Sequence, residues 1–178
     1  MLSKKEIRAE MKRRESAFVI SDAEVAKVWA PVEAGRAFAS ARTVLVYMDI
    51  PGEVPTLDFI ERWRGAKRIL IPLVVGEELE LCEYDPSHLV EGYRGIMEPA
   101  SDARRVPASE VDLALVPGVA FCIRDGRLWR LGRGKGFYDR LLPRMDCPKF
   151  GIYFPFRLVD ELPLDPWDQP LQIITQNG

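Results

Sequence analysis

Two capping motifs near the start of the chain predict two amphipathic helices. Ser3 followed by Glu6, and Ser21 followed by Glu24, each place a hydroxyl three residues before a carboxylate. This arrangement satisfies free N–H groups at the start of a helix, and we expect the first helix over residues 4–16. In the second helix, apolar side chains recur at the helical period, at Val25, Val28, Trp29 and Val32. We expect that stripe to be buried in the core.

Six apolar runs, rich in β-branched and aliphatic residues, predict strands. They cover residues 43–48, 68–75, 79–84, 111–116, 149–154 and 171–175. Further helices are predicted at 55–64, where Pro55 suits a first helical turn, and from Phe137 to Met145. The segment 85–106 contains two prolines and two glycines, which predict loops with at most short elements.

Strands that alternate with helices are typical of an α/β protein. We predict a single domain over residues 1–178, built in three layers with a mostly parallel, mixed central sheet flanked by helices. No internal repeat or low-complexity linker divides the chain.

The composition argues against several classes of protein. Hydrophobic residues make up 47% of the chain and charged residues 29%, and the net charge is −2. That balance argues against a dedicated nucleic-acid-binding protein, whose surface is usually basic. The N-terminus has no apolar secretory stretch, and no run approaches the roughly 20 apolar residues of a membrane span. We expect a cytoplasmic protein in which Cys82, Cys122 and Cys147 are free thiols.

One stretch stands out for its chemistry. From Arg130 to Asp139 the sequence Arg-Leu-Gly-Arg-Gly-Lys-Gly-Phe-Tyr-Asp alternates three glycines with cations. Glycine lets backbone N–H groups come close to a ligand, and successive N–H groups form a concavity that binds anions. Seven cations and two acidic residues lie between Arg124 and Arg144. This local excess of positive charge, between a predicted strand and a predicted helix, indicates a phosphate ligand.

Asp139 in this stretch, and the pair Lys4 and Arg8 in the first helix, each have both a functional and a structural interpretation. Asp139 could hold Mg²⁺ beside a phosphate, or it could only stabilise the first turn of its helix. Lys4 and Arg8 could face one anion from the same side of the first helix, or they could form a solvated basic face. No Ser-His-Asp set, zinc motif or P-loop pattern is present. The residues alone therefore predict a nucleotide-phosphate site and name no substrate.

The glycine-rich stretch and the residues before it resemble the 5-formyltetrahydrofolate cyclo-ligase (methenyltetrahydrofolate synthetase) family. The hallmark of that family is Pro-Gly-x-x-Phe-Asp followed by Arg-Leu-Gly-x-Gly-x-Gly-Tyr-Tyr-Asp, which here stands at residues 117–122 and 130–139. Weaker matches extend over nearly the whole chain, at Lys4, Arg8, Glu53-Val54-Pro55-Thr56, Ile71-Pro72, Glu98-Pro99, Asp168 and Ile173-Ile174-Thr175.

The resemblance implies a reaction in which ATP and 5-formyltetrahydrofolate give 5,10-methenyltetrahydrofolate, ADP and phosphate, with Mg²⁺. The formyl oxygen is phosphorylated, N10 of the folate attacks the activated carbon, and phosphate leaves. Arg133 and Lys135 would then be catalytic, with Asp139 and Asp168 as Mg²⁺ ligands.

The same resemblance implies which residues bind each substrate. The ATP-binding residues would be Lys4, Arg8, Arg130, Leu131, Gly132, Arg133, Gly134, Lys135, Gly136, Phe137 and Tyr138. The folate-binding residues would be Met48, Glu53, Tyr93, Arg133 and Phe137. The expected partner is a reduced folate, with or without a polyglutamate tail, and we expect a monomer with no nucleic-acid or membrane partner.

The sequence departs from the family pattern at several places. Cys122 replaces an aspartate, Phe137 replaces a tyrosine, and the connection 123–129 is longer than usual. Arg157 stands near a usual glutamine, and Trp167 stands where histidine is common. None of these changes removes a phosphate-binding cation. They motivate one alternative, a family member that binds folate or nucleotide without turnover. RNA binding by the loop is a second alternative, which the acidic balance disfavours.

Overall fold

A computed structural model of the chain describes residues 2–92 and 95–174. Its helices are α1 (Lys4–Ala17), α2 (Asp22–Ala34), α3 (Arg36–Ser40), α4 (Leu57–Trp63) and α5 (Phe137–Leu141). Its strands are β1 (Thr43–Leu45), β2 (Arg68–Val75), β3 (Glu78–Glu83), β4 (Leu89–Glu91), β5 (Met97–Pro99), β6 (Arg105–Val106), β7 (Leu113–Val116), β8 (Ala120–Arg124), β9 (Arg127–Leu131) and β10 (Lys149–Gly151).

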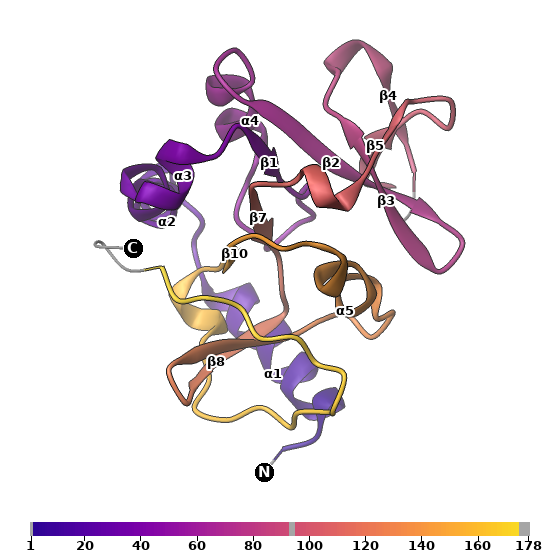
Figure 1. The fold of residues 1–178 in the computed structure, drawn as a ribbon. Coiled ribbons are helices and arrows are strands. Elements are labelled where there is room, and N and C mark those ends of the chain that lie inside the picture. The colour runs from indigo at the N-terminus through magenta and orange to yellow at the C-terminus, as the bar shows by residue number, and fades with distance from the viewer. Residues whose placement is uncertain (1, 93–94, 175–178) are drawn as a thin grey trace.

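Six strands form the central sheet in the order β10-β7-β1-β2-β3-β6. The first four run parallel to one another, whereas β3 and β6 pair antiparallel. Every residue of β1 and β7 is buried, as expected for parallel strands that are covered on both faces. The predicted α/β fold with a mostly parallel, mixed sheet is confirmed (Figure 1).

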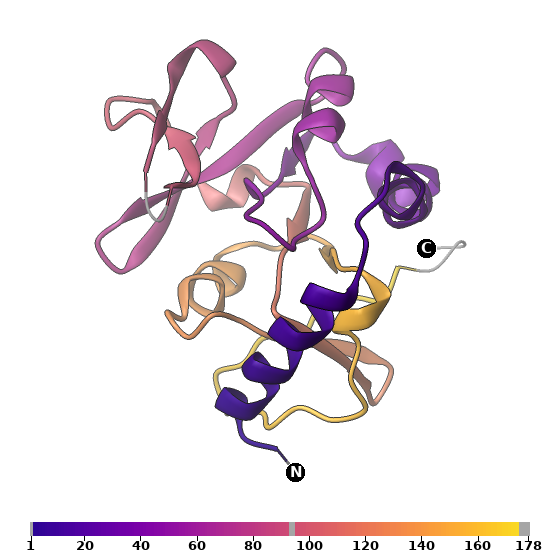
Figure 2. The ribbon, with the colours of Figure 1, turned by 180° about the vertical axis from the view of Figure 1, so that it is seen from behind.

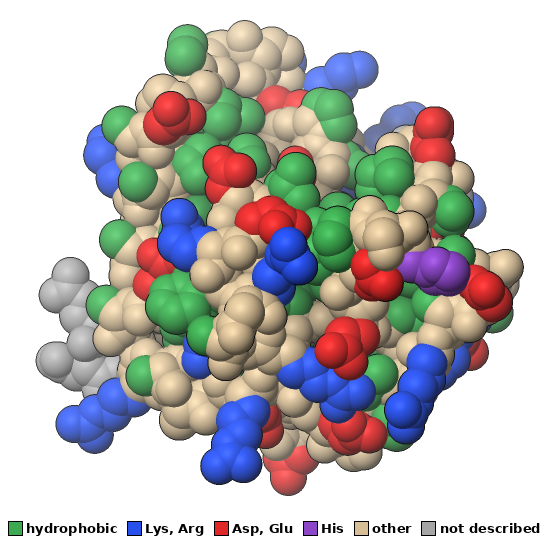
Figure 3. Space-filling view, turned by 90° about the horizontal axis from the view of Figure 1, so that it is seen from above, with side chains coloured by type: hydrophobic (Ala, Val, Ile, Leu, Met, Phe, Trp, Pro, Cys, Tyr) green, Lys and Arg blue, Asp and Glu red, His purple; other side chains and the backbone are tan. Residues whose placement is uncertain are grey.

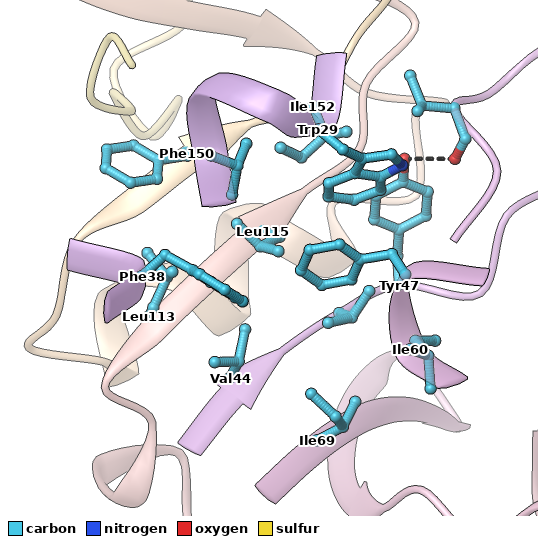
Figure 4. Close-up of a cluster of buried hydrophobic side chains, with 14 of the residues drawn as sticks. Trp29, Phe38, Val44, Tyr47, Ile60, Ile69, Leu113, Leu115, Phe150 and Ile152 are labelled. Carbon is cyan, nitrogen blue, oxygen red and sulfur yellow. Dashed lines mark hydrogen bonds between the residues drawn. The ribbon is translucent and has the colours of Figure 1, made fainter. Parts of the chain in front are cut away.

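Alternate residues of the central strands pack against opposite layers, because successive side chains of a strand point to opposite faces. On one face, Val44 and Leu115 join residues of α2, α3 and α4 in a single apolar cluster (Figure 4). Trp29 of α2 stacks on Phe59 of α4 with 4.1 Å between ring centroids. The dashed line in Figure 4 marks the hydrogen bond that the Tyr47 hydroxyl donates to a backbone carbonyl at 2.8 Å.

On the other face, the sheet packs against α5 and the two-stranded β8–β9 hairpin. Leu45 and Val116 from the sheet share a cluster with Leu141 of α5 and with Phe121 and Leu128 of the hairpin. Helix α1 in turn covers the far side of the hairpin, and this outer contact can be followed in Figure 2. The sheet therefore has a layer on each face, as the three-layer prediction requires.

Several predicted elements are shorter than their apolar runs. The strands in the runs 43–48 and 149–154 end at Leu45 and Gly151. The next residues, Val46 and Ile152, each donate one more backbone hydrogen bond to a neighbouring strand and are buried. The helix predicted from 55 begins at Leu57. The helix predicted to reach Met145 ends at Leu141 and continues as a 3-10 turn, since Pro143 cannot donate the next helical hydrogen bond.

The predicted closing strand 171–175 is wrong for the part that the structure describes. Leu171 bridges Leu128 antiparallel and Gln172 bridges Phe150 parallel, so the segment crosses between two neighbours without forming a ladder with either. Thr175 lies outside the described residues.

The β8–β9 hairpin was not among the predicted elements, and it changes the place of two site residues. Its strands pair from Ala120↔Leu131 to Arg124↔Arg127, and the turn is made by Asp125 and Gly126, both with positive φ. An Asp-Gly pair between apolar runs is a strong hairpin signal. As a result, Arg130 and Leu131 lie on a strand and not in the glycine-rich loop.

The cysteines, the helices and the surface can be compared with what the composition predicted. Cys82, Cys122 and Cys147 are free, as predicted. In the described part of the chain, no helix is both long and apolar enough to cross a membrane. The face drawn in Figure 3 carries acidic and basic side chains interspersed with hydrophobic ones, without a large area of one sign.

The packing at Gly151 predicts a local limit on side-chain size. A Cβ there would come within 2.6 Å of a Leu128 methyl and 2.7 Å of the Phe121 ring, whereas nothing lies within 4 Å of one at Gly65. Gly151→Ala should lower the free energy of unfolding by about 1–3 kcal/mol through overpacking, and Gly65→Ala should leave it nearly unchanged. Urea denaturation measures both, and equal stabilities of the two variants would contradict the packing.

Candidate active site

The glycine-rich loop, residues 132–136, connects β9 to α5 and depends on its glycines for backbone shape. Gly134 has φ +100° and Gly136 has φ +68°, a region that residues with a Cβ rarely adopt. Arg8 of α1 donates from Nε to the carbonyl of Gly132 at 3.0 Å. Of the two cations of α1 predicted to face one anion, Lys4 and Arg8, it is Arg8 that contacts the glycine-rich loop directly.

The cations of this stretch differ in their surroundings. Arg130 is 7% exposed, donates to the carbonyl of Pro117 at 2.9 Å, and pairs with Asp139 at 3.2 Å. Its guanidinium also lies over the Tyr138 ring. Lys135, by contrast, is exposed, and no side-chain partner for it is found among the described residues. Arg130 thus braces the loop while Lys135 remains available to a ligand.

Arg133 connects the loop to the turn after β1. Its guanidinium pairs with Oε1 of Glu53 at 3.1 Å, and Oε2 of Glu53 accepts from the backbone N–H of Ile50 at 3.3 Å. Glu53 is only 8% exposed. Burial raises its pKa above the ordinary value of 4.5, although Arg133 acts in the opposite direction. A residue predicted to bind folate and a residue predicted to be catalytic therefore form one ion pair.

An apolar pocket of about 170 Å³ opens beside this ion pair. Its walls come from the turn after β1, from β2 and β3, from β5 and from the loop. They are formed by Tyr47, Met48, Ile50, Glu53, Pro72, Val74, Leu79, Ile96, Glu98, Pro117, Gly118, Arg130, Gly132, Arg133, Lys135, Gly136, Phe137 and Tyr138. The predicted folate residues thus come together here, except Tyr93, which lies outside the described residues.

A second, basic hollow of about 370 Å³ lies between α1 and the start of β8. It is lined by Arg8, Met11, Lys12, Glu15, Val119, Arg133 and Arg157. Of its four cations, Arg133 and Arg157 are paired with carboxylates, and Arg8 and Lys12 give the hollow an excess of positive charge. Arg133 lines both this hollow and the apolar pocket, so its side chain lies at the boundary between them.

Arg157 holds three segments together at the back of the basic hollow. It is 2% exposed, donates to the carbonyls of Val119 and Gly52, and pairs with Glu15 of α1 at 2.8 Å. Because Gly52 precedes Glu53, these bonds fix the turn that carries the buried carboxylate. In the sequence Arg157 was visible only as a departure from a family pattern, since a role between distant segments leaves no local signal.

Lys4 and Asp168, both predicted on the ATP side, also lie together. The Lys4 ammonium pairs with Asp168 at 2.9 Å and with Asp165 at 2.7 Å. Burial alone would lower the pKa of Lys4, but the hydrogen bonds to these two carboxylates outweigh that effect and raise it. The N-terminal helix is thereby joined to the segment that follows β10.

The two predicted Mg²⁺ ligands are each paired with a cation. Asp139 holds Arg130 and Asp168 holds Lys4. Over residues 2–92 and 95–174, no group of three or more His, Cys, Asp or Glu side chains gathers as a metal site. A Mg²⁺ that arrives with a phosphate ligand needs only one or two carboxylates from the protein, so either aspartate alone would suit it.

Comparisons with known proteins identify the family to which the chain is similar. The 5-formyltetrahydrofolate cyclo-ligase family model matches residues 1–177. The chain is 38% identical over 143 residues to the 5-formyltetrahydrofolate cyclo-ligase of Escherichia coli (strain K12), covering 75% of this chain and 77% of that protein. It superimposes on the NMR structure of Aquifex aeolicus 5,10-methenyltetrahydrofolate synthetase with TM-score 0.80 and 34% identity, covering 94% and 86% of the chains. The Mycoplasma pneumoniae synthetase gives TM-score 0.69 at 25% identity, covering 99% and 100%.

The raised pKa of Glu53 predicts a pH-dependent stability. A carboxyl group whose pKa is higher in the folded state makes its full contribution to stability at pH values below its pKa in the unfolded chain, near 4.5. That contribution is lost as the pH rises through the pKa of the folded state. Glu53→Gln removes the charging step. The melting temperature of Glu53→Gln relative to that of the wild type should therefore increase as the pH rises from about 4.5 to about 8.

Differential scanning calorimetry of both proteins across this range tests the prediction. Glu91→Gln, at an exposed position, serves as the control and should show no such gain. A melting-temperature difference between Glu53→Gln and wild type that stays constant or reverses with pH would contradict it.

Proposed function

The chain belongs to the 5-formyltetrahydrofolate cyclo-ligase family and is a ligase, and we propose that it phosphorylates the formyl oxygen of 5-formyltetrahydrofolate with ATP to form 5,10-methenyltetrahydrofolate. The observation that supports this mechanism is the position of Arg133, whose side chain lines both the apolar pocket and the basic hollow. A cation at that boundary can contact a folate on one side and phosphates on the other.

The apolar pocket suits the ring system of a reduced folate. Met48 and Phe137 line it and offer apolar surface to a flat ring. Glu53 lies on the same wall and can accept hydrogen bonds from pterin N–H groups. Tyr93, which lies outside the described residues, keeps its predicted role in folate binding.

The loop and the basic hollow suit the phosphates of ATP. The Arg8 guanidinium lies near Gly134, 3.5 Å from where a Cβ would stand, and the exposed Lys135 is the next residue. The backbone of Gly134 leaves room for a close phosphate oxygen. Lys4 lies one turn before Arg8 at the start of α1. It would exchange its bonds to Asp165 and Asp168 for bonds to ATP. The remaining ATP-binding residues of the proposal are Arg130, Leu131, Gly132, Arg133, Gly136, Phe137 and Tyr138.

The proposed reaction balances without a protein nucleophile. The formyl oxygen attacks the γ-phosphorus of ATP and ADP leaves. N10 of the folate then attacks the formyl carbon, the bond from that carbon to the phosphorylated oxygen breaks, and N10 loses its proton as phosphate departs. Phosphoryl transfer needs positioning and charge neutralisation above all. Arg133 and Lys135 would neutralise the charge that moves from ATP to the formyl oxygen.

Asp139 and Asp168 would hold Mg²⁺ bound to the phosphates of ATP, and the ion would neutralise phosphate charge. The carboxylates of these residues would have to share their present cations, Arg130 and Lys4, with the metal. Action as a monomer in the cytoplasm stays a prediction.

Two departures from the family pattern, Cys122 and the longer connection 123–129, give no structural support to the non-catalytic alternative. Cys122 packs with Ile7 and Met11 of α1 in an apolar cluster, and it is absent from the linings of both cavities. The longer connection 123–129 lies in the hairpin, whose pairing stays regular down to Leu131. Neither change therefore disturbs the cations of the loop.

The proposed function predicts that the purified protein forms the methenyl chromophore from 5-formyltetrahydrofolate and Mg-ATP, with one ADP released per product. Absorbance and a coupled ADP assay measure the two products. Tight binding of folate or ATP without folate-dependent ADP release, from a protein that is folded by circular dichroism, would favour the non-catalytic alternative.

Loss of the exposed loop cation should affect chemistry and not folding. Lys135→Ala should lower kcat by roughly 10²–10³ because one charge-stabilising group is lost, while the melting temperature stays close to wild type. Lys27→Ala, which removes one cation from the distant helix α2, is the control and should keep full activity. An unchanged kcat together with a large fall in melting temperature for Lys135→Ala would refute the assignment.

A further inference from the structure

A second carboxylate, Glu98, lines the apolar pocket. It is the middle residue of β5, a three-residue strand that pairs with β4 outside the central sheet, and it is half-buried. Its neighbours in the pocket wall include Pro72, Val74 and Leu79 of β2 and β3. A carboxylate on such an apolar wall is costly unless it receives hydrogen bonds.

The two carboxylates of the pocket differ in how far their oxygens are already used. Both oxygens of Glu53 have partners, Arg133 on Oε1 and the Ile50 N–H on Oε2. For Glu98, the described residues supply one long hydrogen bond, from the Val74 N–H to Oε2 at 3.5 Å. Since a carboxylate can accept about four hydrogen bonds, Glu98 has more unused acceptor capacity than Glu53 as far as the described residues are concerned.

The backbone leaves room for the Glu98 side chain in one particular place. A Cβ at Gly92 would lie 1.9 Å from Oε1 of Glu98, so the carboxylate rests over a residue that has no side chain. The Gly92 N–H donates to the carbonyl of Ile96 at 2.8 Å, which holds the β4–β5 hairpin closed behind it. The carboxylate of Glu98, a residue that lines the pocket, thus lies against the backbone of Gly92.

We propose that Glu98 binds the donor edge of the pterin ring, accepting hydrogen bonds from its 2-amino group and N3–H. Two adjacent N–H groups on a planar edge match the two oxygens of a carboxylate. Glu53, which already pairs with Arg133, would then accept only from the remaining pterin N–H groups. This inference rests on the proposed function, because it takes the occupant of the pocket to be a reduced folate.

The test measures equilibrium binding of two ligands by calorimetry without ATP, so that it does not depend on turnover. The ligands are 5-formyltetrahydrofolate and its 2-desamino-2-methyl analogue, which lacks one donor. Glu98→Gln should weaken binding of the natural folate roughly ten- to hundredfold, the loss typical for hydrogen bonds to a charged group. It should weaken the analogue much less. Glu98→Asp, which withdraws the carboxylate by one methylene, should also bind the natural folate more weakly.

Glu91→Gln is the matched control, since Glu91 lies on the partner strand β4 and is absent from the pocket lining. It should bind both ligands as the wild type does. Unchanged binding of the natural folate by folded Glu98→Gln, or equal losses for both ligands, would overturn the inference. A wild type that binds the folate but forms no methenyl product would count against the proposed function alone.

Discussion

The ion pair between Arg133 and Glu53 is the interaction on which the site depends. It joins the glycine-rich loop to the turn after β1, two segments that are 80 residues apart. Each end is braced: Arg8 holds the loop at Gly132, and Arg157 holds the turn at Gly52. Burial of Glu53 raises its pKa, so the fold accepts an unfavourable charge to keep Arg133 in position. Perturbed carboxylates of this kind often mark functional sites.

Arg133 lies between two cavities of different character and lines both of them. In the proposed mechanism, the apolar pocket would exclude water from a ring-shaped substrate, and the basic hollow would bind phosphate groups. In phosphoryl transfer the negative charge moves between the two reactants, and a fixed cation on that path stabilises the transition state more than either ground state. The site therefore needs no side chain that forms a covalent bond, which is consistent with the lack of a nucleophile–base pair in the sequence. Glu98 would add recognition at the far wall without taking part in the chemistry.

Much of this arrangement follows from local sequence, and the rest depends on tertiary contacts. Periodicity and caps predicted α1, α2 and the buried strands, and the glycine-cation pattern predicted the loop. The β8–β9 hairpin has a readable Asp-Gly turn at Asp125, but its strands lie where a loop entry was expected. The roles of Arg157 and Glu98 could not be predicted, because each depends on partners from segments that the sequence keeps apart. Their burial against a turn and a hairpin appears only after the chain has folded.

In the proposed reaction, the formyl oxygen becomes an oxygen of the released phosphate, with Arg133 and Lys135 beside its path. The most direct measurement uses 5-formyltetrahydrofolate that carries ¹⁸O in its formyl group, converted with unlabelled ATP in ordinary water. Mass spectrometry of the products follows the label. We expect one ¹⁸O atom in each released phosphate and none in the water. Unlabelled phosphate formed together with the methenyl product would contradict it.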